Sequence, residues 1–556
     1  MRRFQTFALL LAVARILPAI TVEQFHPHDF ALAGQASGNP FDVEVRGEFT
    51  GPDGTRIVVP GFYAGGNTWK IRFSATMPGR WSMKTVSPVA ALNGHVEANI
   101  DCAKNSNSAI HGGLRVDPVN RHHFVFEDGS RYFLMGYEAD WLWGADMKDP
   151  ERKVMHHLID QMVARGFNHV LVNIYAHDTG WSKGHQNQWD YAPTEMYVFG
   201  GTNDQPDHST LNTAFFDAYD GMMNALLDKG IVANVMIKVY NKMVNWPKPG
   251  SKDEERYFRY VAARYQAYPN ITWDFSKEAY NEHDKGLEKR LIDLVRADDG
   301  YHRLTTAHDN DLYDWDSRLN TNLDFVTDQE HFYWKEAVLF ERQLLPWPIV
   351  NSELYYERGV DDLPTYPVKQ DWQDMIRGAY EVYLSGGYFV YYYSNTAWDL
   401  VKPDPEPPGM PRFQILKENL SALPYWLMEP HPEFAMGGPC LASPGDVYAF
   451  LVQQPQRPAG AGRGRGGPPN AGPAPAGSAA APSGGGRGGR GRPNLNSSRE
   501  IAVNLNGLRG PATGQWVNIW SGEKSEFAIG GPGVYQFNRP ESFDTAPGLL
   551  VVRAQK

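Results

Sequence analysis

This chain has little cysteine and no long apolar segment. Cys102 and Cys440 are its only cysteines; they match no zinc-binding spacing and can pair only if two terminal domains touch. Beyond the N-terminus, no segment reaches the roughly 18 uninterrupted apolar residues of a membrane-spanning helix. The sequence therefore predicts a soluble mature protein, and its cysteines predict no zinc site.

Basic residues are in deficit as well. The 53 Lys and Arg residues against 64 Asp and Glu residues give a net charge of −11, which argues against nucleic acid as the main partner. The exception is segment 455–498, which is rich in Gly, Pro, Ala and Arg and has no acidic residue. Such a composition buries too little apolar surface to order itself, so we expect a disordered surface loop. An RNA-binding tail, or adhesion to acidic polysaccharide or cell wall, is the alternative interpretation.

Several catalytic motifs are absent from the sequence. It contains no Gly-rich phosphate loop ahead of a helix and no Gly-x-Ser-x-Gly elbow, which argues against nucleotide and serine-hydrolase chemistry. It also has no His-Glu-x-x-His motif, and the pairs His122-His123 and His156-His157 fall on a predicted hairpin and a predicted helix. We therefore expect neither a metal nor a cofactor. A metal-dependent hydrolase stays an alternative, because barrel folds often carry His and Asp clusters.

The N-terminus has the layout of a secretory signal peptide. It begins Met1-Arg-Arg-Phe and continues with an apolar stretch that includes the small residues Ala12, Ala14 and Ala19. We place this signal peptide at residues 1–21 and expect a secreted or periplasmic protein. Arg15 interrupts the apolar stretch, so the start helix of a cytosolic protein is the alternative.

Two flanking regions have the pattern of β-sandwich domains. In residues 22–112, Trp69, Ile71 and Phe73 alternate with charged residues, so one face of that strand is buried and the other is solvated. Residues 426–556 form short apolar strands on either side of segment 455–498. We expect a β-sandwich at each end of the chain.

The region between them, residues 113–425, alternates strands with helices. A helix over residues 210–229 has apolar side chains at helical spacing and ends at Gly230. Eight alternating units predict an α/β fold with a (β/α)8 barrel rather than an open sheet. The strands are expected near Phe133, Val170, Val235, Ile271, Thr305, Phe325, Ile349 and Phe389.

Two glutamates directly follow apolar strands of this barrel. Glu278 closes the run that begins at Ile271, and Glu353 closes the run that begins at Trp347. Because active sites of such barrels lie at the C-terminal strand ends, we expect the two carboxyl groups at one rim. Hydrolysis of a glycosidic bond needs one carboxyl group to protonate the leaving oxygen and another to attack or stabilise the anomeric carbon. The pair therefore predicts a glycoside hydrolase with a carbohydrate substrate.

Other polar and aromatic side chains gather at the same strand ends. Aromatic rings offer flat apolar faces for sugars, and we expect two or three of five tryptophans to line the cleft and the others to lie in the core. These five are Trp141, Trp143, Trp181, Trp334 and Trp398. The candidates for binding sugar hydroxyls are Asp140, Asn173, His177, Tyr240, His308 and His331.

At these residues the chain resembles clan A retaining glycoside hydrolases. Glu278 and Glu353 match the acid/base and nucleophile positions, and His331-Phe-Tyr333 resembles the segment whose tyrosine contacts the nucleophile. A β-sandwich before the barrel and a β-domain after it are similar to the apiosidase-like branch of polysaccharide-degrading enzymes. The resemblance implies double displacement on a plant or algal polysaccharide or oligosaccharide, with carboxyl groups roughly 5 to 5.5 Å apart.

The chain departs from the clan at one position. Lys277 stands where the clan usually has an Asn that binds the sugar 2-hydroxyl. Lys277 is expected either to bind an anionic substrate group or to pair with a neighbouring acid. Asn281-Glu282 offers a second register, but Glu282 lies further into the following loop, so we favour Glu278. The main alternative function is a carbohydrate-binding or adhesion protein on a barrel that has lost catalysis; the sequence indicates no oligomeric state.

Overall fold

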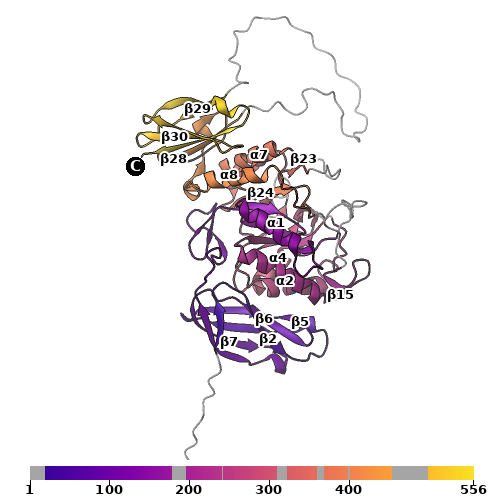
Figure 1. The fold of residues 1–556 in the computed structure, drawn as a ribbon. Coiled ribbons are helices and arrows are strands. Elements are labelled where there is room, and N and C mark those ends of the chain that lie inside the picture. Colours follow the sequence, from indigo (N-terminus) through magenta and orange to yellow (C-terminus); the bar gives the residue numbers. More distant parts are fainter. Residues whose placement is uncertain are drawn as a thin grey trace, which may run out of the picture. The chain divides into compact units, whose positions relative to one another are not determined.

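The computed structural model describes residues 19–177, 196–240, 242–309, 322–359, 369–397, 401–453 and 499–555 (Figure 1). It divides into two compact units, Met1–Trp426 and Leu427–Lys556. Most of the predicted signal peptide, segment 455–498, Trp181 and Trp398 lie outside the described residues. No helix within the described ranges is long and apolar enough to cross a membrane.

The first unit begins with a β-sandwich. Its strands are β1 (Ile20–Glu23), β2 (His28–Ala33), β3 (Arg46–Thr50), β4 (Arg56–Pro60), β5 (Phe62–Gly65), β6 (Thr68–Phe73), β7 (Gly79–Val86) and β8 (Val96–Ala103). They form a five-stranded sheet, β1-β8-β7-β3-β4, and a three-stranded sheet, β2-β6-β5. The alternating side chains Trp69, Ile71 and Phe73 are buried in a core shared by both sheets, as their spacing predicts. The other face is not solvated throughout as expected, because Arg72 is 5% exposed.

A parallel barrel follows in the same unit. Its strands are β12 (Met135–Glu138), β13 (His169–Asn173), β16 (Val232–Val239), β17 (Ile271–Lys277), β18 (Thr305–Thr306), β19 (His308–Asp309), β20 (Val326–Asp328), β21 (Ile349–Asn351) and β24 (Tyr388–Tyr393). The order β18-β17-β16-β13-β12-β24-β21-β20-β19 runs around the barrel, and only Ala307 separates its two ends. Counting β18 and β19 as one strand gives the predicted (β/α)8 barrel.

Helices alternate with these strands. They are α1 (Lys153–Ala164), α2 (Thr213–Asp228), α3 (Lys252–Tyr265), α4 (Lys285–Asp298), α6 (Trp334–Leu344), α7 (Trp372–Leu384) and α8 (Met410–Leu420). The Asn212 side chain caps α2 by accepting from the Phe215 amide, and Gly230 follows the helix with a φ of 69°. Buried Phe215, Tyr219 and Met222 hold its inner face against the barrel, which confirms the predicted helix to within three residues at its start and one at its end.

The first unit also contains shorter strands outside the eight of the barrel. They are β9 (Leu114–Val116), β10 (Phe124–Phe126), β11 (Arg131–Tyr132), β14 (Phe199–Gly201), β15 (Pro206–Leu211), β22 (Tyr356–Glu357) and β23 (Lys369–Gln370). β10 and β11 form the predicted hairpin just before the first barrel strand. β22 pairs with β24 beyond the end of β21, and this pairing matters for the site.

The second unit is another β-sandwich. Its strands are β25 (Glu429–Pro430), β26 (Ala435–Met436), β27 (Cys440–Ser443), β28 (Val447–Val452), β29 (Glu500–Asn504), β30 (Ala512–Asn518), β31 (Lys524–Ile529), β32 (Val534–Asn538) and β33 (Gly548–Ala554). One sheet runs β25-β27-β28-β33-β30-β31 and the other β26-β29-β32, with apolar side chains of both in one core. Cys440 in this unit and Cys102 in the first are both free and buried.

A buried ion-pair network joins the N-terminal sandwich to the barrel. Arg72 on β6 donates to Asp220 on α2 over 2.8 Å and to the backbone oxygen of Arg264 on α3 over 3.2 Å. Arg264 also donates to Asp220, over 2.8 Å, so one carboxylate balances two buried guanidinium groups. These charges keep the pKa of Asp220 below its usual value even though burial raises it. Without Asp220, Arg72 keeps Asp29 and Arg264 keeps Asp217 as partners, but the carboxylate that the two arginines share is lost.

We predict that Asp220→Ala destabilises the protein by about 3–5 kcal/mol, because it leaves two buried cations without their shared partner. Asp217→Ala is the matched control: Asp217 lies on the same helix and pairs with the same Arg264, but its side chain is 61% exposed. Its loss should cost less than about 1 kcal/mol. Urea unfolding measures both values, and equal losses would contradict the network's role.

Candidate active site

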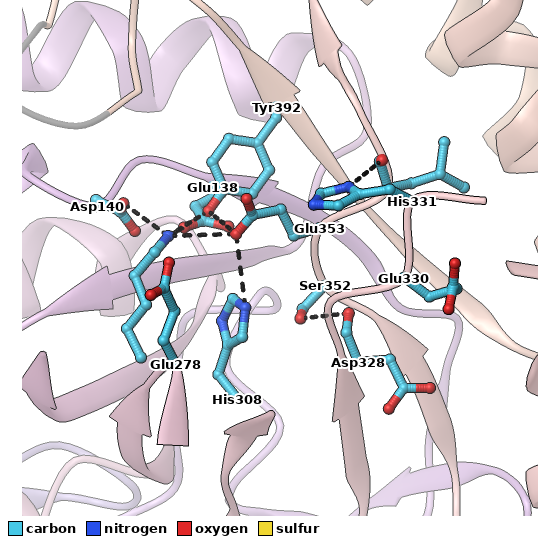
Figure 2. A network of polar contacts seen from close by, with 12 residues as sticks. Glu138, Asp140, Glu278, His308, Asp328, Glu330, His331, Ser352, Glu353 and Tyr392 are labelled. Atoms are coloured by element: carbon cyan, nitrogen blue, oxygen red, sulfur yellow. Dashed lines mark hydrogen bonds and ion pairs between the residues drawn. The ribbon is translucent and has the colours of Figure 1, made fainter. Parts of the chain in front are cut away.

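Glu278 and Glu353 both lie at the C-terminal end of the barrel. Glu278 directly follows β17, and Glu353 stands two residues after β21. Figure 2 shows their carboxyl groups directed toward one polar cluster that contains Glu138, Asp140, His308 and Tyr392. Lys277 belongs to the same cluster, because its ammonium contacts Glu138, Asp140 and Tyr392. Both side chains are buried: Glu353 is 1% exposed and Glu278 is 7% exposed. The strand order therefore brings together the two glutamates that the sequence singled out.

Glu353 is surrounded by groups that favour its ionised form. The hydroxyl of Tyr356 donates to Oε1, and that of Tyr392 donates to Oε2 over 3.3 Å. Lys277 Nζ and His308 Nε2 each lie 3.6 Å from Oε2. Burial by itself raises the pKa of Glu353, but Lys277, His308, His331 and the Tyr356 hydroxyl outweigh it and bring the pKa to about 2. Glu353 is therefore a carboxylate at neutral pH.

His308 contributes little positive charge to this cluster at neutral pH. It is fully buried, and burial together with the nearby Lys277 ammonium lowers its pKa to about 4. The imidazole is thus neutral over most of the pH range in which Glu353 is ionised. Its backbone N–H donates to Asp274 over 3.0 Å and fixes its place on β19.

Glu278 has the opposite electrostatic environment. Burial and the charge of Glu353 raise its pKa, while Lys277 and Lys242 act against this rise. Its backbone has a φ of 57°, a left-handed conformation that is uncommon outside glycine and that turns the chain sharply at the end of β17. The Asn281 amide donates to its carboxylate over 3.4 Å. A neutral Glu278 and an ionised Glu353 are the protonation states that an acid and a nucleophile require.

Glu282, the other register, has partners of its own. The Tyr240 hydroxyl donates to Glu282 Oε2 over 2.6 Å, and the Asp284 amide donates to Oε1 over 2.9 Å. Tyr240, a predicted sugar-binding residue, is thus engaged with Glu282, and its ring lies under the Lys238 ammonium. This geometry favours Glu278 as the carboxyl group that faces Glu353.

Lys277 does not have the free ammonium that would suit an anionic substrate. Its Nζ donates to Glu138, to Asp140 over 3.0 Å and to the Tyr392 hydroxyl over 2.6 Å, which uses all three of its hydrogens. The residue is 1% exposed. The expectation that Lys277 binds a substrate anion is therefore wrong, and its alternative, pairing with a neighbouring acid, describes the structure.

Tyr333 is also placed differently from its prediction. Its side chain is 60% exposed, and its backbone N–H donates to Glu330 at the start of α6. The hydroxyl groups that contact Glu353 belong to Tyr356 and Tyr392, which sequence reasoning missed. His331 lies nearby with Nδ1 2.7 Å from the Leu354 carbonyl oxygen.

The strand registers explain why these tyrosines reach the site. Tyr392 on β24 is the direct cross-strand partner of Glu138 on one side and of Tyr356 on the other. The three side chains thus form one row across β12, β24 and β22. Glu138 was missed as well, although its spacing of two residues from Asp140 is a signal for the same strand face.

The tryptophans differ from the expected stacking surfaces. Trp141 and Trp143 are 1% and 0% exposed, and the Trp143 ring packs against Tyr175 and Phe215 in the core. Trp334 on α6 donates to Glu381 on α7 over 2.9 Å, so it joins two outer helices. Packing or a hydrogen bond thus engages these three. Trp181 and Trp398 lie outside the described residues, so the expectation that two or three of the five line the cleft stays a prediction.

The remaining candidates for hydroxyl binding lie at strand ends. Asn173 is fully buried at the end of β13 and accepts from Trp143 Nε1 over 2.8 Å. Asp140 is fully buried beside Lys277, and His177 is half-buried after β13. Their contact with a sugar stays a prediction.

Two further features lie outside this cluster. Within the described part of the chain, no group of His, Cys, Asp or Glu is arranged to hold a metal ion. A cavity of about 700 Å³ lies between the N-terminal sandwich and α3, but its charged groups, such as Arg256 and Asp42, already pair with each other.

Comparisons with known proteins agree with this architecture. Residues 119–426 match the family described as apiosidase-like, catalytic domain, and residues 21–88 match DUF5060, a domain of unknown function. A candidate glycoside hydrolase from Bacteroides vulgatus ATCC 8482 is 17% identical, with a TM-score of 0.72 over 96% of this chain and 99% of that one. A glycoside hydrolase family 5 structure from the same organism is 15% identical, with a TM-score of 0.55 over 80% of this chain and 93% of that one. No curated protein matches.

The matched barrel, together with its fold, defines the class of this protein as a glycoside hydrolase. The match spans more than half of the 556 residues. The chain belongs to the apiosidase-like family.

Proposed function

We propose that this protein is a retaining glycoside hydrolase that acts by double displacement, with Glu353 as nucleophile and Glu278 as acid/base. The observation that supports these roles is the opposite pKa shift of two buried carboxyl groups that face one cluster: lowered to about 2 for Glu353 and raised for Glu278. Two neighbouring carboxyl groups in one buried site cannot both stay ionised at low cost, and opposite shifts of their pKa values fit this reaction.

In the first step, a Glu353 oxygen forms a bond to the anomeric carbon while the bond from that carbon to the leaving oxygen breaks. Glu278 gives its proton to the leaving oxygen. In the second step, Glu278, now a carboxylate, takes a proton from water as that water attacks the anomeric carbon and releases Glu353. The hydroxyl groups of Tyr356 and Tyr392 hold the Glu353 carboxylate in place throughout.

The substrate class that we propose is a plant or algal polysaccharide or oligosaccharide. Membership of the apiosidase-like family supports a glycoside of this kind. The signal-peptide pattern at the N-terminus supports export of the protein. Export fits this substrate class, since such polymers occur outside the cell. A panel of plant and algal polysaccharides, with analysis of the released sugars, identifies the substrate.

Glu353→Gln should lower kcat by at least about 1,000-fold with little change in affinity for the sugar, because the amide keeps the shape but loses the nucleophile. Turnover is measured on the active member of the panel and affinity by calorimetry. Proton NMR of the first sugar released by the wild type should show the same anomer as the substrate. A released anomer of opposite configuration contradicts double displacement. A variant with wild-type turnover shows that Glu353 is not the nucleophile, whereas sugar affinity without turnover in the wild type indicates a binding protein.

Glu278→Gln should impair natural glycosides far more than aryl glycosides with good leaving groups, because an acidic phenol departs without a donated proton. The expected loss is about 100-fold or more for the former and clearly less for the latter. Glu282→Gln is the matched control and should retain the wild-type ratio between the two substrates. A loss confined to the Glu282 variant would assign the acid to the other register.

Tyr356→Phe should lower kcat/KM by about 10- to 100-fold, since a hydrogen bond to a charged group contributes roughly 1.5–3 kcal/mol. Tyr333→Phe, the control, should change it less than about threefold, because that side chain is exposed and Tyr333 meets Glu330 through its backbone. Steady-state kinetics on one substrate compares the two. A larger effect at Tyr333 would restore the role that the sequence resemblance implies.

A further inference from the structure

We propose that Lys277, together with Glu138 and Asp140, forms a buried charge group that keeps the Glu353 nucleophile ionised and in position. This inference rests on the role proposed for Glu353. It makes Lys277 a positioning residue, because its ammonium reaches protein carboxyl groups and leaves no hydrogen for a substrate.

The contacts place Lys277 at the centre of three elements. It projects from the end of β17 to Glu138 on β12, to Asp140 just after β12 and to Tyr392 on β24. Its Nζ also lies 3.6 Å from Glu353 Oε2. The Lys277 and Glu353 side chains are each 2% exposed, and those of Glu138 and Asp140 are 0% exposed. Water therefore screens these charges very little.

Charge balance implies one further proton in the cluster. Three carboxyl groups around one ammonium would leave two uncompensated negative charges in a site closed to bulk solvent, which is costly. Glu138 Oε2 and Asp140 Oδ1 are buried without another hydrogen-bond partner, and a proton on Glu138 donated to Asp140 satisfies both atoms. Burial and the adjacent Asp140 charge raise the pKa of Glu138 well above its usual value, which agrees with a protonated Glu138.

The other groups that face Glu353 do not replace this cation at neutral pH. His308 from β19 is neutral because its pKa is lowered to about 4, and Tyr356 and Tyr392 donate neutral hydroxyls. His331, after β20, adds to the lowering of the Glu353 pKa but uses Nδ1 on the Leu354 carbonyl oxygen. Glu278, which also faces Glu353, is the proposed acid and supplies no positive charge. Among the described residues, Lys277 is thus the lasting positive charge within 4 Å of Glu353.

Lys277→Met removes the charge and keeps much of the side-chain volume. We expect the acid limb of the kcat/KM pH profile to move up by about one to three pH units, because the opposite charge that favours the Glu353 carboxylate is gone. Lys277→Arg keeps the charge, so its acid limb should stay within about half a unit of the wild type even if its rate falls. An unchanged limb in Lys277→Met, or an equal shift in Lys277→Arg, overturns the proposal. Should Lys277→Met fail to fold, the Lys277→Arg profile decides.

Glu138→Gln tests the shared proton. An amide donates to Asp140 as a protonated acid does, so the acid limb should stay near that of the wild type. If Glu138 were ionised, the substitution would remove a negative charge and lower the pKa of Glu353, so the limb would move down. That downward movement would contradict the protonated Glu138.

A measurement without substrate separates this inference from the proposed function. In the wild type, the pKa of Glu353 is lower in the folded protein than in the unfolded chain, where it is near 4.5. Above this pH the difference stabilises the folded protein, and the stabilisation is lost as the pH falls toward 2. In Lys277→Met the folded pKa of Glu353 should rise by about one to three units toward the unfolded value, so this variant should lose less stability than the wild type as the pH falls. The melting temperatures of the two proteins should therefore converge on acidification, and adding Glu353→Gln to Lys277→Met should remove the pH-dependent difference. Parallel melting curves overturn the charge role, whereas absence of turnover in the wild type overturns only the proposed function.

Discussion

Closure of the parallel sheet between β12 and β24 is the constraint on which the candidate site depends. Glu138 pairs directly with Tyr392 across that seam, and Tyr392 pairs with Tyr356 on its other side. The same closure brings the end of β17, with Lys277 and Glu278, to the ends of β12 and β24. Without it, residues more than a hundred positions apart in the chain would have no reason to share one cluster. The candidate site thus depends first on the closure of the barrel, which brings these residues together, and only then on the identity of each residue.

The second constraint is that buried charges have to balance. The interior of the barrel mouth holds an ammonium, several carboxyl groups and an imidazole with almost no exposure to water. Each of these groups alone would be expensive to bury, so the cluster is tolerated only as a set. The pKa shifts follow this balance: they are raised for Glu138 and Glu278 and lowered for Glu353 and His308.

The sequence predicted the parts of this arrangement that follow from periodicity and order. Apolar runs located the barrel strands, and residues just after two of them, Glu278 and Glu353, face one cluster. It failed where the answer depends on which way a side chain points. Tyr333 and Tyr356 both lie near strand ends, yet only the pairing of β22 with β24 directs Tyr356 to Glu353. Trp141 and Trp143 failed for a related reason: a large ring near a strand end packs equally well into the core, and spacing does not distinguish the two.

Lys277 stands where the clan usually has an asparagine, and its contacts in the structure indicate what it does there. A lysine beside the acid invites the idea of an anion-binding site, but a buried ammonium with three hydrogen bonds has no vacancy for a substrate. Its effect reaches the reaction through the neighbouring carboxylates instead. Glu278 and Glu353 are both buried, yet Glu353 lies 3.6 Å from the ammonium and accepts two tyrosine hydroxyls, whereas Glu278 has the Asn281 amide at 3.4 Å. Because the burial is similar, this difference in partners is what lowers the pKa of Glu353 while the pKa of Glu278 is raised.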